Sequence, residues 1–369
     1  MFKVKRLLVC AVVASLLLFG SLLPSGFADG GANHRVRNMR FGVSGGNVND
    51  ASRRFCCSGT LGAMITDGSN QYVLSNNHVL GRSGQAVAGE DVSQPGLIDS
   101  NCNIATVVAD FAGAPVLGSS NVDAAVAQLR ADQMDSSGSI EDIGVPSSTI
   151  SAPVVGMSVA KSGRTTGFTT GSISSINTSV SVQYQANCGG GKKFTVAFTN
   201  QIVIGPGSFS AGGDSGSLIV TNNASHNPVG LLFAGSSSVT IANPIGEVLV
   251  RLGAALGRTF SFSGGGGGGN VSTTSGNERR PFIPGLENLM QTLPEQASAR
   301  ALGVLELHRA NIMFQPGVMG AGIGASGRVD GEAAIVIYVN KDAAAKPALA
   351  DSIDGIPVVV IETDQFVAR

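Results

Sequence analysis

The chain is best understood from one stretch, Gly212-Gly213-Asp214-Ser215-Gly216-Ser217-Leu218-Ile219-Val220. A serine hydroxyl is a poor nucleophile until a base removes its proton. Glycines on both sides let the backbone bend tightly enough to aim successive amides at one point. The stretch therefore predicts a nucleophile at Ser215, with the amides of Gly213 and Ser215 as an oxyanion hole. The alternative is an ordinary polar turn between two strands.

A general base must come from elsewhere in the chain, which has four histidines: His34, His78, His226 and His308. We favour His78, which stands where an apolar run ending at Ser75 meets a turn. A single histidine in such a place is more often structural than catalytic. Its pairing with a nucleophilic serine favours the catalytic interpretation.

The third group should be a buried aspartate that orients the imidazole. Asp123 has apolar neighbours on both sides, and we prefer it to the rival Asp110 or to a solvated acid in a turn. The candidates then follow one another in the order His78, Asp123, Ser215. This is the chain order of the chymotrypsin type and not of subtilisins or α/β-hydrolases. An esterase of the latter fold is disfavoured for the same reason and because no GxSxG elbow surrounds Ser215.

Short apolar runs, separated by Gly, Ser, Asn and Asp, fill the chain from about residue 41 to residue 256 and predict an all-β domain of two barrels or a sandwich. The runs are Thr60–Thr66, Gln71–Ser75, Ile104–Asp110, Ala124–Leu129, Val154–Lys161, Ser172–Ile176, Phe194–Thr199, Ser217–Thr221 and Val229–Ala234. Residues 244–256 give the one good helix signal in this region, with a proline near its start.

Composition excludes several classes of protein. The chain has 369 residues, of which 43% are hydrophobic and 13% charged, so it is too apolar for a disordered chain. The 51 glycines have no three-residue period, which excludes collagen. A formal net charge of −1 gives no reason to expect a nucleic-acid partner. The length suggests about two domains.

The first 28 residues have the pattern of a secretory signal peptide. Lys3, Lys5 and Arg6 precede an apolar run over residues 7–23, and small residues stand before a cut after Ala28. The alternative is a membrane anchor at the short limit of length. No later run is long enough to span a bilayer. We therefore expect an exported protein, secreted or periplasmic.

Four cysteines remain after that cut: Cys56, Cys57, Cys102 and Cys188. An even number in an exported chain favours two disulfides. A bond between the neighbours Cys56 and Cys57 would be strained, which leaves two pairings open. The absence of a CxxC pair argues against a zinc site.

The composition and the pattern of apolar residues change after residue 260. Residues 261–282 include six consecutive glycines and predict a flexible linker. Residues 283–369 predict a small α/β module of unknown role, with helix-like segments at 285–310 and 341–352 and strands at 318–323, 333–339 and 356–361. Gly322, Gly324 and Gly327 fit the phosphate-binding pattern GxGxxG, but a strand follows instead of a helix, so we expect a hairpin.

Several motifs together resemble a known family. They are the nucleophile stretch with His78, Lys161–Gly167 (KSGRTTG), Leu74–Leu80 (LSNNHVL), Gln94-Pro95-Gly96, Leu231–Gly235 (LLFAG) and Ala242-Asn243-Pro244. The chain resembles trypsin/chymotrypsin-like serine peptidases of the bacterial type, such as α-lytic protease and the streptogrisins, and the Narrow leaf-type trypsin-like proteins. The resemblance covers about residues 58–260, and residues 29–57 are then an N-terminal extension.

The resemblance implies a mainly β fold, a chymotrypsin-like double β-barrel with the cleft between the barrels. His78 and Asp123 would come from the first barrel and Ser215 from the second. Phe233-Ala234-Gly235 would be an edge that pairs with the substrate backbone. Lys161 would pair with Asp214 and shape the oxyanion loop.

The sequence departs from the family at the expected specificity pocket. Residues 205–213 contain no Asp or Glu, so a preference for Lys or Arg is not supported. Phe209 would narrow the pocket, and we expect a small or apolar preference. Positions 160 and 170 are not cysteines, so the disulfide pattern differs from that of α-lytic-like enzymes.

The sequence therefore predicts an exported serine endopeptidase that acts on protein or peptide substrates and needs no metal or cofactor. The alternative is a non-catalytic or autoinhibited binding protein on a protease fold. The C-terminal module could bind substrate, tether the protein to a surface, or contact the protease domain and inhibit it.

Overall fold

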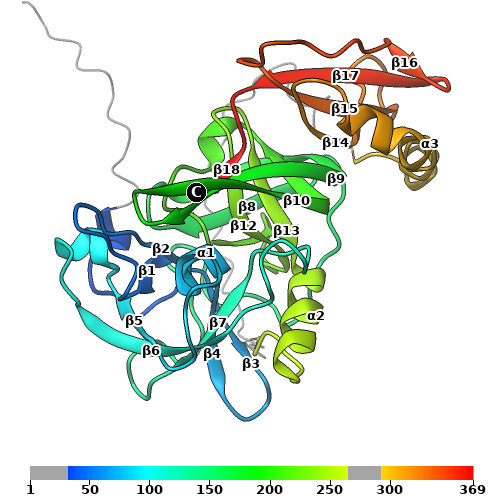
Figure 1. Cartoon of the computed structure of the whole chain (residues 1–369). Helices are drawn as coiled ribbons and strands as arrows, with labels where there is room; N and C mark the ends of the chain where they lie inside the picture. The colour runs from blue at the N-terminus through cyan, green and yellow to red at the C-terminus, as the bar shows by residue number, and fades with distance from the viewer. Residues whose placement is uncertain (1–31, 265–291, 369) are drawn as a thin grey trace, which may run out of the picture.

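The computed structural model describes residues 32–264 and 292–368. The predicted signal peptide and most of the predicted linker lie outside the described residues. Two β-barrels follow one another in the chain, and a small α/β module comes after them (Figure 1). The prediction of a mainly β, chymotrypsin-like double barrel with a small α/β module is confirmed.

The first barrel has seven strands in the order β2-β1-β5-β6-β7-β4-β3. They are β1 (Val43–Asn47), β2 (Gly59–Leu61), β3 (Ala63–Thr66), β4 (Gln71–Ser75), β5 (Asp91–Gln94), β6 (Thr106–Gly113) and β7 (Ala125–Leu129). The end strands β2 and β3 are separated in the chain by Gly62 alone, which nearly closes the sheet. Strand β1 lies in the stretch expected to be an N-terminal extension. It pairs with both β2 and β5, so the first barrel begins before residue 58.

The second barrel is a closed ring of six strands. They are β8 (Ser158–Gly163), β9 (Gly167–Asn187), β10 (Gly190–Gly205), β11 (Leu218–Thr221), β12 (Pro228–Gly235) and β13 (Thr240–Pro244). The order is β10-β13-β12-β11-β8-β9, and an additional β9–β10 pairing closes the ring. Helix α2 (Ile245–Leu256) follows directly, and its buried residues Val248 and Leu252 pack into the main core.

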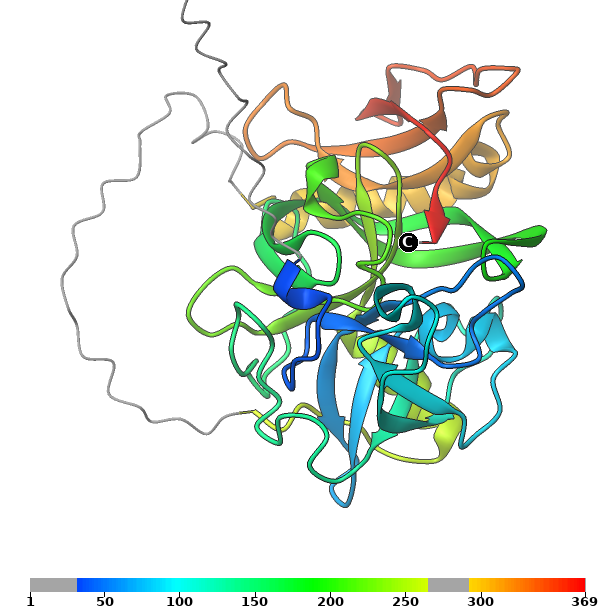
Figure 2. The same ribbon diagram turned by 90° about the vertical axis from the view of Figure 1, so that its left-hand side faces the viewer.

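The C-terminal module continues the sheet of the second barrel. It contains α3 (Glu295–Met313), β14 (Val318–Ala325), β15 (Ala333–Asn340), β16 (Ser352–Ile353) and β17 (Ile356–Thr363). Strand β14 pairs with β9 of the barrel and with β15, and β15 pairs in parallel with β17. In Figure 2 the second barrel lies between the first barrel and this module. A final strand, β18 (Val367–Ala368), leaves the module and returns to the second barrel.

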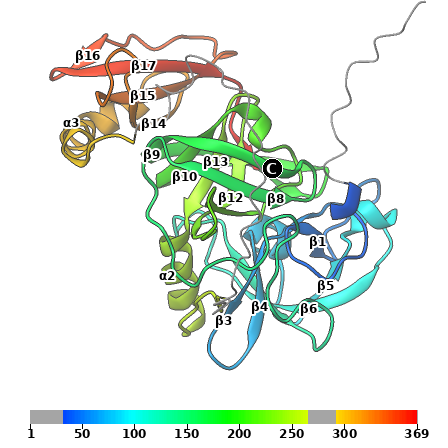
Figure 3. The ribbon, with the colours of Figure 1, turned by 180° about the vertical axis from the view of Figure 1, so that it is seen from behind.

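Most of the elements expected in the module are present, with one exception. The glycine pattern around Gly322 and Gly324 forms the antiparallel hairpin of β14 and β15, as expected. The helix expected over residues 341–352 is wrong, because that stretch contains no helix. Pro347 lacks the N–H that a helix needs, and the amide of Lys341 donates instead to the carbonyl of Thr363 at 2.8 Å. The view from behind shows α3 against one face of the module's sheet (Figure 3).

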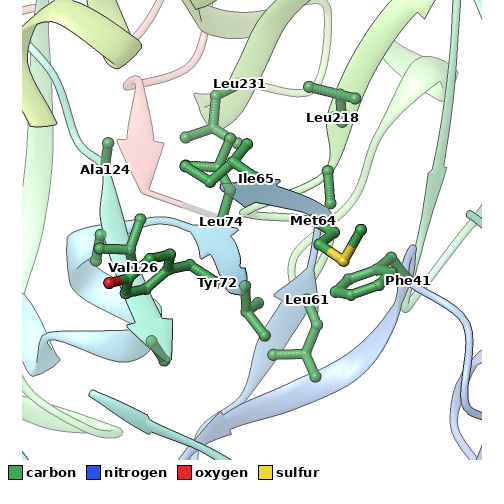
Figure 4. Packing of buried hydrophobic residues seen from close by; sticks show 14 of the residues in the cluster. Phe41, Leu61, Met64, Ile65, Tyr72, Leu74, Ala124, Val126, Leu218 and Leu231 are labelled. Atoms are coloured by element: carbon green, nitrogen blue, oxygen red, sulfur yellow. The ribbon is translucent and has the colours of Figure 1, made fainter. Parts of the chain in front are cut away.

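Apolar side chains from both barrels meet in one large core. Leu61, Ile65 and Leu74 of the first barrel are fully buried, and Leu218 and Leu231 of the second belong to the same cluster (Figure 4). A shared core of this kind fixes the position of one barrel relative to the other, because each side chain fills space between its neighbours. The site described below lies where the barrels meet.

Two disulfides join the four cysteines: Cys56 with Cys102 and Cys57 with Cys188. This is one of the two pairings that the sequence left open. The second bond ties the chain before β2 to the end of β9, so it links the two barrels covalently. Among residues 32–264 and 292–368, no helix has the length and apolar character needed to cross a membrane.

Candidate active site

Ser215 lies just before β11, against a strand of the other barrel. Its carbonyl accepts a hydrogen bond from the amide of Thr60 in β2 at 2.8 Å. A side chain at Gly59 would be 2.9 Å from the Ser215 carbonyl and 2.6 Å from Cγ2 of Val79. Glycine at position 59 therefore lets Ser215 approach the short helix α1 (Asn77–Leu80), which carries His78. The Ser215 side chain is fully buried, and its hydroxyl donates to the carbonyl of Phe233 at 3.3 Å.

His78 and Asp123 are in direct contact. His78 Nδ1 lies 2.6 Å from Oδ2 of Asp123, and the His78 amide donates to Oδ1 of the same carboxylate at 3.2 Å. A carboxylate only accepts hydrogen bonds, so this contact places the proton of the neutral imidazole on Nδ1 and the lone pair on Nε2. That is the tautomer a general base needs. Asp110, the rival acid, instead pairs with Arg130 on the first barrel's surface.

Asp123 is fully buried, and hydrogen bonds hold it from several directions. Its amide donates to Oδ1 of Asn243 at 2.9 Å, and its carbonyl accepts from Nδ2 of Asn76 at 2.6 Å. The Tyr184 hydroxyl, on β9 of the second barrel, donates to Oδ2 at 2.9 Å. Burial and the neighbouring Asp123 raise the pKa of Tyr184 well above its usual value, so it stays a donor. These contacts fix both the backbone and the carboxylate of Asp123 in the position from which it reaches His78.

The two backbone amides predicted to form an oxyanion hole differ from the neighbouring amides in their hydrogen bonding. The amides of Asp214, Gly216 and Ser217 each donate to a backbone carbonyl. Within the described part of the chain, the hydrogen bonds include none donated by the amides of Gly213 or Ser215. Amide donors left available beside a nucleophile suit a developing negative charge.

Two glycines of this loop have conformations and surroundings that exclude a side chain. Gly213 has φ +98°, and a Cβ there would be 2.5 Å from Oγ1 of Thr165. Gly216 has φ +94°, and a Cβ there would collide with the Ser75 hydroxyl and the Thr60 carbonyl. Glycine is thus required at positions 213 and 216, by the turn and by the close approach of β2.

The end of β8 and the segment that follows it contact the loop that carries Asp214 and Ser215. Asp214 is fully buried and accepts hydrogen bonds from the amides of Ala211, Thr165 and Thr166 and from the Thr166 hydroxyl. Lys161 Nζ lies 3.6 Å from Oδ2 of Asp214, and it also donates to the Thr166 hydroxyl. The predicted partners therefore lie together, with Thr166 between them. Burial lowers the pKa of Lys161, and the charge of Asp214 opposes that effect.

A second ion pair supports the same loop from the first barrel. Arg164 donates to both oxygens of Asp99, at 2.6 and 2.7 Å, and both side chains are largely buried. The Arg164 amide donates to the hydroxyl of Thr60, which in turn donates to the carbonyl of Gly213 at 2.9 Å. The family-like stretch at residues 161–167 therefore positions the loop that carries Ser215.

The expected substrate edge is the end of β12. Phe233 and Ala234 are fully buried, and β18 pairs with Ala234 and Gly235. Phe209 is also buried, in the same apolar cluster of the second barrel as Ile173 and Ile204. Its carbonyl accepts from the Thr169 hydroxyl at 2.7 Å.

A cavity of about 420 Å³ opens beside His78. Its lining includes Asp50, Cys57, His78, Tyr184, Val367 and Ala368. Burial raises the pKa of the Asp50 carboxyl to about 6, against the opposing charges of His78 and Arg82. In residues 32–264 and 292–368, no three His, Cys, Asp or Glu side chains gather closely enough to hold a metal ion.

Two further residues hold Asp123, and no local sequence pattern points to either of them. Tyr184 lies within a 21-residue strand, and no local pattern sets it apart. Asn243 belongs to a motif that was quoted for its resemblance, yet its contact with Asp123 depends on the packing of the two barrels.

Comparisons with known proteins agree with the resemblance that the motifs predicted. The family described as the Nal1 C-terminal domain matches residues 97–243. No curated protein sequence matches the chain. One similar solved structure is a glutamic acid-specific serine protease that uses a histidine triad in substrate binding. It is 20% identical with a TM-score of 0.43, and the match covers 60% of this chain and 98% of the other.

Two further solved structures are similar to a comparable degree. Thermobifida fusca protease A is 19% identical with a TM-score of 0.40, over 58% of this chain and 96% of the other. The α-lytic protease homologue N4 is 18% identical with a TM-score of 0.40, over 62% of this chain and 98% of the other. The predicted resemblance to bacterial chymotrypsin-like serine proteases and to Nal1-type proteins is confirmed.

Proposed function

We propose that this chain is an exported serine endopeptidase that hydrolyses peptide bonds through Ser215, His78 and Asp123. The observation that supports the proposal most is the 2.6 Å contact between His78 Nδ1 and the buried carboxylate of Asp123, next to a loop that carries Ser215. Donors from both barrels hold Asp123, which in turn keeps the imidazole of His78 in one orientation.

The mechanism follows from the chemistry of these groups. His78 Nε2 takes the proton of the Ser215 hydroxyl as the serine oxygen attacks a peptide carbonyl. Asp123 holds the imidazole in the required tautomer and stabilises the imidazolium. The amides of Gly213 and Ser215 bind the tetrahedral oxyanion. The imidazolium then gives its proton to the leaving amine, and an acyl-enzyme forms on Ser215. Water, activated by His78, releases the acyl group and restores the serine.

Substrate would add to the chain as an extended strand along Phe233-Ala234-Gly235. The absence of Asp and Glu from residues 205–213 supports a small or apolar residue at the cleavage site. The two disulfides support export, because such bonds persist in oxidising compartments. An exported protein would begin at Asp29 when its N-terminus is sequenced.

The second candidate is a binding protein in which the protease site is closed. It is favoured by one observation, the pairing of β18 with the end of β12. The two candidates are separated by incubating the full chain with a fluorophosphonate probe and unfolded casein. We expect labelling and cleavage that both disappear in Ser215→Ala and persist in Ser69→Ala, which changes an exposed serine in the turn between β3 and β4. Absence of labelling at neutral pH, even in a chain shortened at its C-terminus, would contradict the peptidase.

A further inference from the structure

The last strand of the described chain lies between two strands of the second barrel. β18 pairs antiparallel with β12, placing Val367 opposite Gly235 and Ala368 opposite Ala234. On its other side Val367 pairs in parallel with Gln183 of β9, whose amide donates to the Phe366 carbonyl at 2.9 Å. Figures 1 and 2 show the strand leaving the module and entering the second barrel.

The direction of β18 leads toward the nucleophile. Because the pairing is antiparallel, the strand passes Gly235 first and Ala234 next, and so runs toward Phe233. The carbonyl of Phe233 accepts the hydrogen bond of the Ser215 hydroxyl. Val367 and Ala368 also line the cavity that contains His78. An extended peptide that adds to this edge would therefore meet β18 in its place.

The segment before β18 is fixed firmly to both parts of the molecule. The Thr363 hydroxyl donates to the Ser236 hydroxyl at 2.7 Å, and the Ser237 amide donates to the Asp364 carboxylate at 3.2 Å. The hydrogen bonds from Ser237 lower the pKa of Asp364, so it remains charged at neutral pH. Phe366 is fully buried, with its ring centre 5.7 Å from that of Tyr338.

Strand β18 itself makes fewer contacts than residues 363–366, the anchor that precedes it. It has only two residues, and 39% of the Val367 surface is exposed. A short strand makes few backbone hydrogen bonds, so it can leave the edge while Phe366 stays buried. The anchor nevertheless keeps it beside the edge at a high effective concentration, which disfavours a free peptide competing for the same pairing.

We propose that β18 is an internal pseudosubstrate strand: it occupies the peptide-binding edge at Ala234 and Gly235, and an extended peptide substrate must displace it. The inference rests on the proposed function, because it assigns this edge to substrate. It gives the C-terminal module a role, which is to deliver and hold the strand. The peptidase activity of the chain is then lowest while β18 is paired with β12, and it rises when the strand leaves this edge.

The first test compares the full chain with a chain that ends at Phe366. The shortened chain keeps the buried anchor and loses only β18 and the residue after it. We expect its kcat/KM for unfolded casein to rise tenfold or more, with an unchanged Tm. Asp330→Ala, which changes an exposed acid elsewhere in the module, should behave as the full chain does. Equal rates of cleavage in the shortened and full chains, with Ser215 labelled by fluorophosphonate in both, would overturn the inference and leave the peptidase intact.

The second test does not depend on catalysis. Hydrogen exchange is followed in Ser215→Ala with and without an excess of reduced, alkylated casein. We expect the amides of residues 367 and 368 to exchange faster when casein is present, because peptide takes their place on β12. In Ser215→Ala shortened at Phe366, the segment Ala234–Gly235 should exchange faster without casein and be protected when casein is added. Unchanged exchange of residues 367 and 368 on adding casein would overturn the inference. This outcome does not depend on whether the chains that keep Ser215 react with the fluorophosphonate.

Discussion

The Tyr184 hydroxyl donates a 2.9 Å hydrogen bond to the carboxylate of Asp123, so a strand of the second barrel orients an acid that belongs to the first. Both side chains are buried. The contact fixes Asp123 at the position from which it reaches His78, and it couples the orientation of the imidazole to the docking of the two barrels. Tyr184 is in this sense a positioning residue.

Tyr184→Phe removes this hydrogen bond while keeping the ring. Loss of a hydrogen bond to a charged group is worth about 1.5–3 kcal/mol, so we expect kcat to fall roughly 10- to 100-fold with little change in KM. The pH profile of kcat/KM should also shift, because Asp123 would stabilise the imidazolium differently. Tyr72→Phe removes a comparable contact, to Asp67 in the first barrel, and serves as the control. A lower Tm with an unchanged kcat and pH profile would show that Tyr184 is merely structural.

The loop glycines give a prediction about folding. Gly216→Ala forces a side chain into the Ser75 hydroxyl and the Thr60 carbonyl at φ +94°, and we expect a loss of stability of about 2–4 kcal/mol. Gly212→Ala, in the same loop, meets no atom within 4 Å and should change stability by less than about 0.5 kcal/mol. Denaturant unfolding of both variants measures the difference. Equal stability of the two variants would be inconsistent with the tight approach of β2.

Asp50 predicts how stability depends on pH. Burial raises its pKa to about 6 from an ordinary value of 3.8, so the native state binds its proton more tightly than the unfolded state does. The free energy of unfolding that this group contributes therefore falls as pH rises from about 4 to about 6 and is constant above that range. Asp50→Asn should be more stable than the parent chain by about 3 kcal/mol at pH 7.5 and nearly equal to it at pH 4.

The measurement for Asp50 is the midpoint of urea unfolding at the two pH values. Asp132→Asn, which changes an exposed acid, is the control and should show no pH-dependent difference from the parent. If Asp50→Asn and the parent differ equally at pH 4 and pH 7.5, the carboxyl does not have the environment described.

The two disulfides predict how many free thiols the protein has. Cys56, Cys57, Cys102 and Cys188 should show no free thiol when the protein purified from outside the cytoplasm is alkylated under denaturing conditions. Removing the bond between Cys57 and Cys188, which closes a longer loop and links the barrels, should cost about 2–5 kcal/mol of stability. Complete alkylation of all four thiols without a reducing agent would argue against both the bonds and export.

Local patterns in the sequence predicted much of the site and the strands around it. His78, Asp123 and Ser215 each stand beside a recognisable apolar run, because a buried strand must place its polar neighbours at its ends. The glycines at 213 and 216 reflect a backbone conformation that almost no other residue adopts, so they too could be found locally.

The remaining features depend on contacts between distant segments. Strand β1 precedes the stretch that the resemblance covers and so falls in the expected extension, yet it pairs with β2 and β5 of the first barrel. The stretch 341–352 has helix-forming alanines, but Pro347 and the pairing of Lys341 with Thr363 prevent a helix. The return of β18 to β12 joins residues more than a hundred positions apart, which no spacing in the sequence predicts.

The most direct test of the proposed peptidase is the position of a fluorophosphonate adduct. The full chain and the chain ending at Phe366 are each treated with the probe at neutral pH, and the modified residue is located by peptide mass mapping. We expect a single adduct on Ser215, formed faster in the shortened chain, lost in Ser215→Ala and kept in Ser69→Ala. No adduct in either chain, or an adduct on another residue that survives Ser215→Ala, would contradict the proposal.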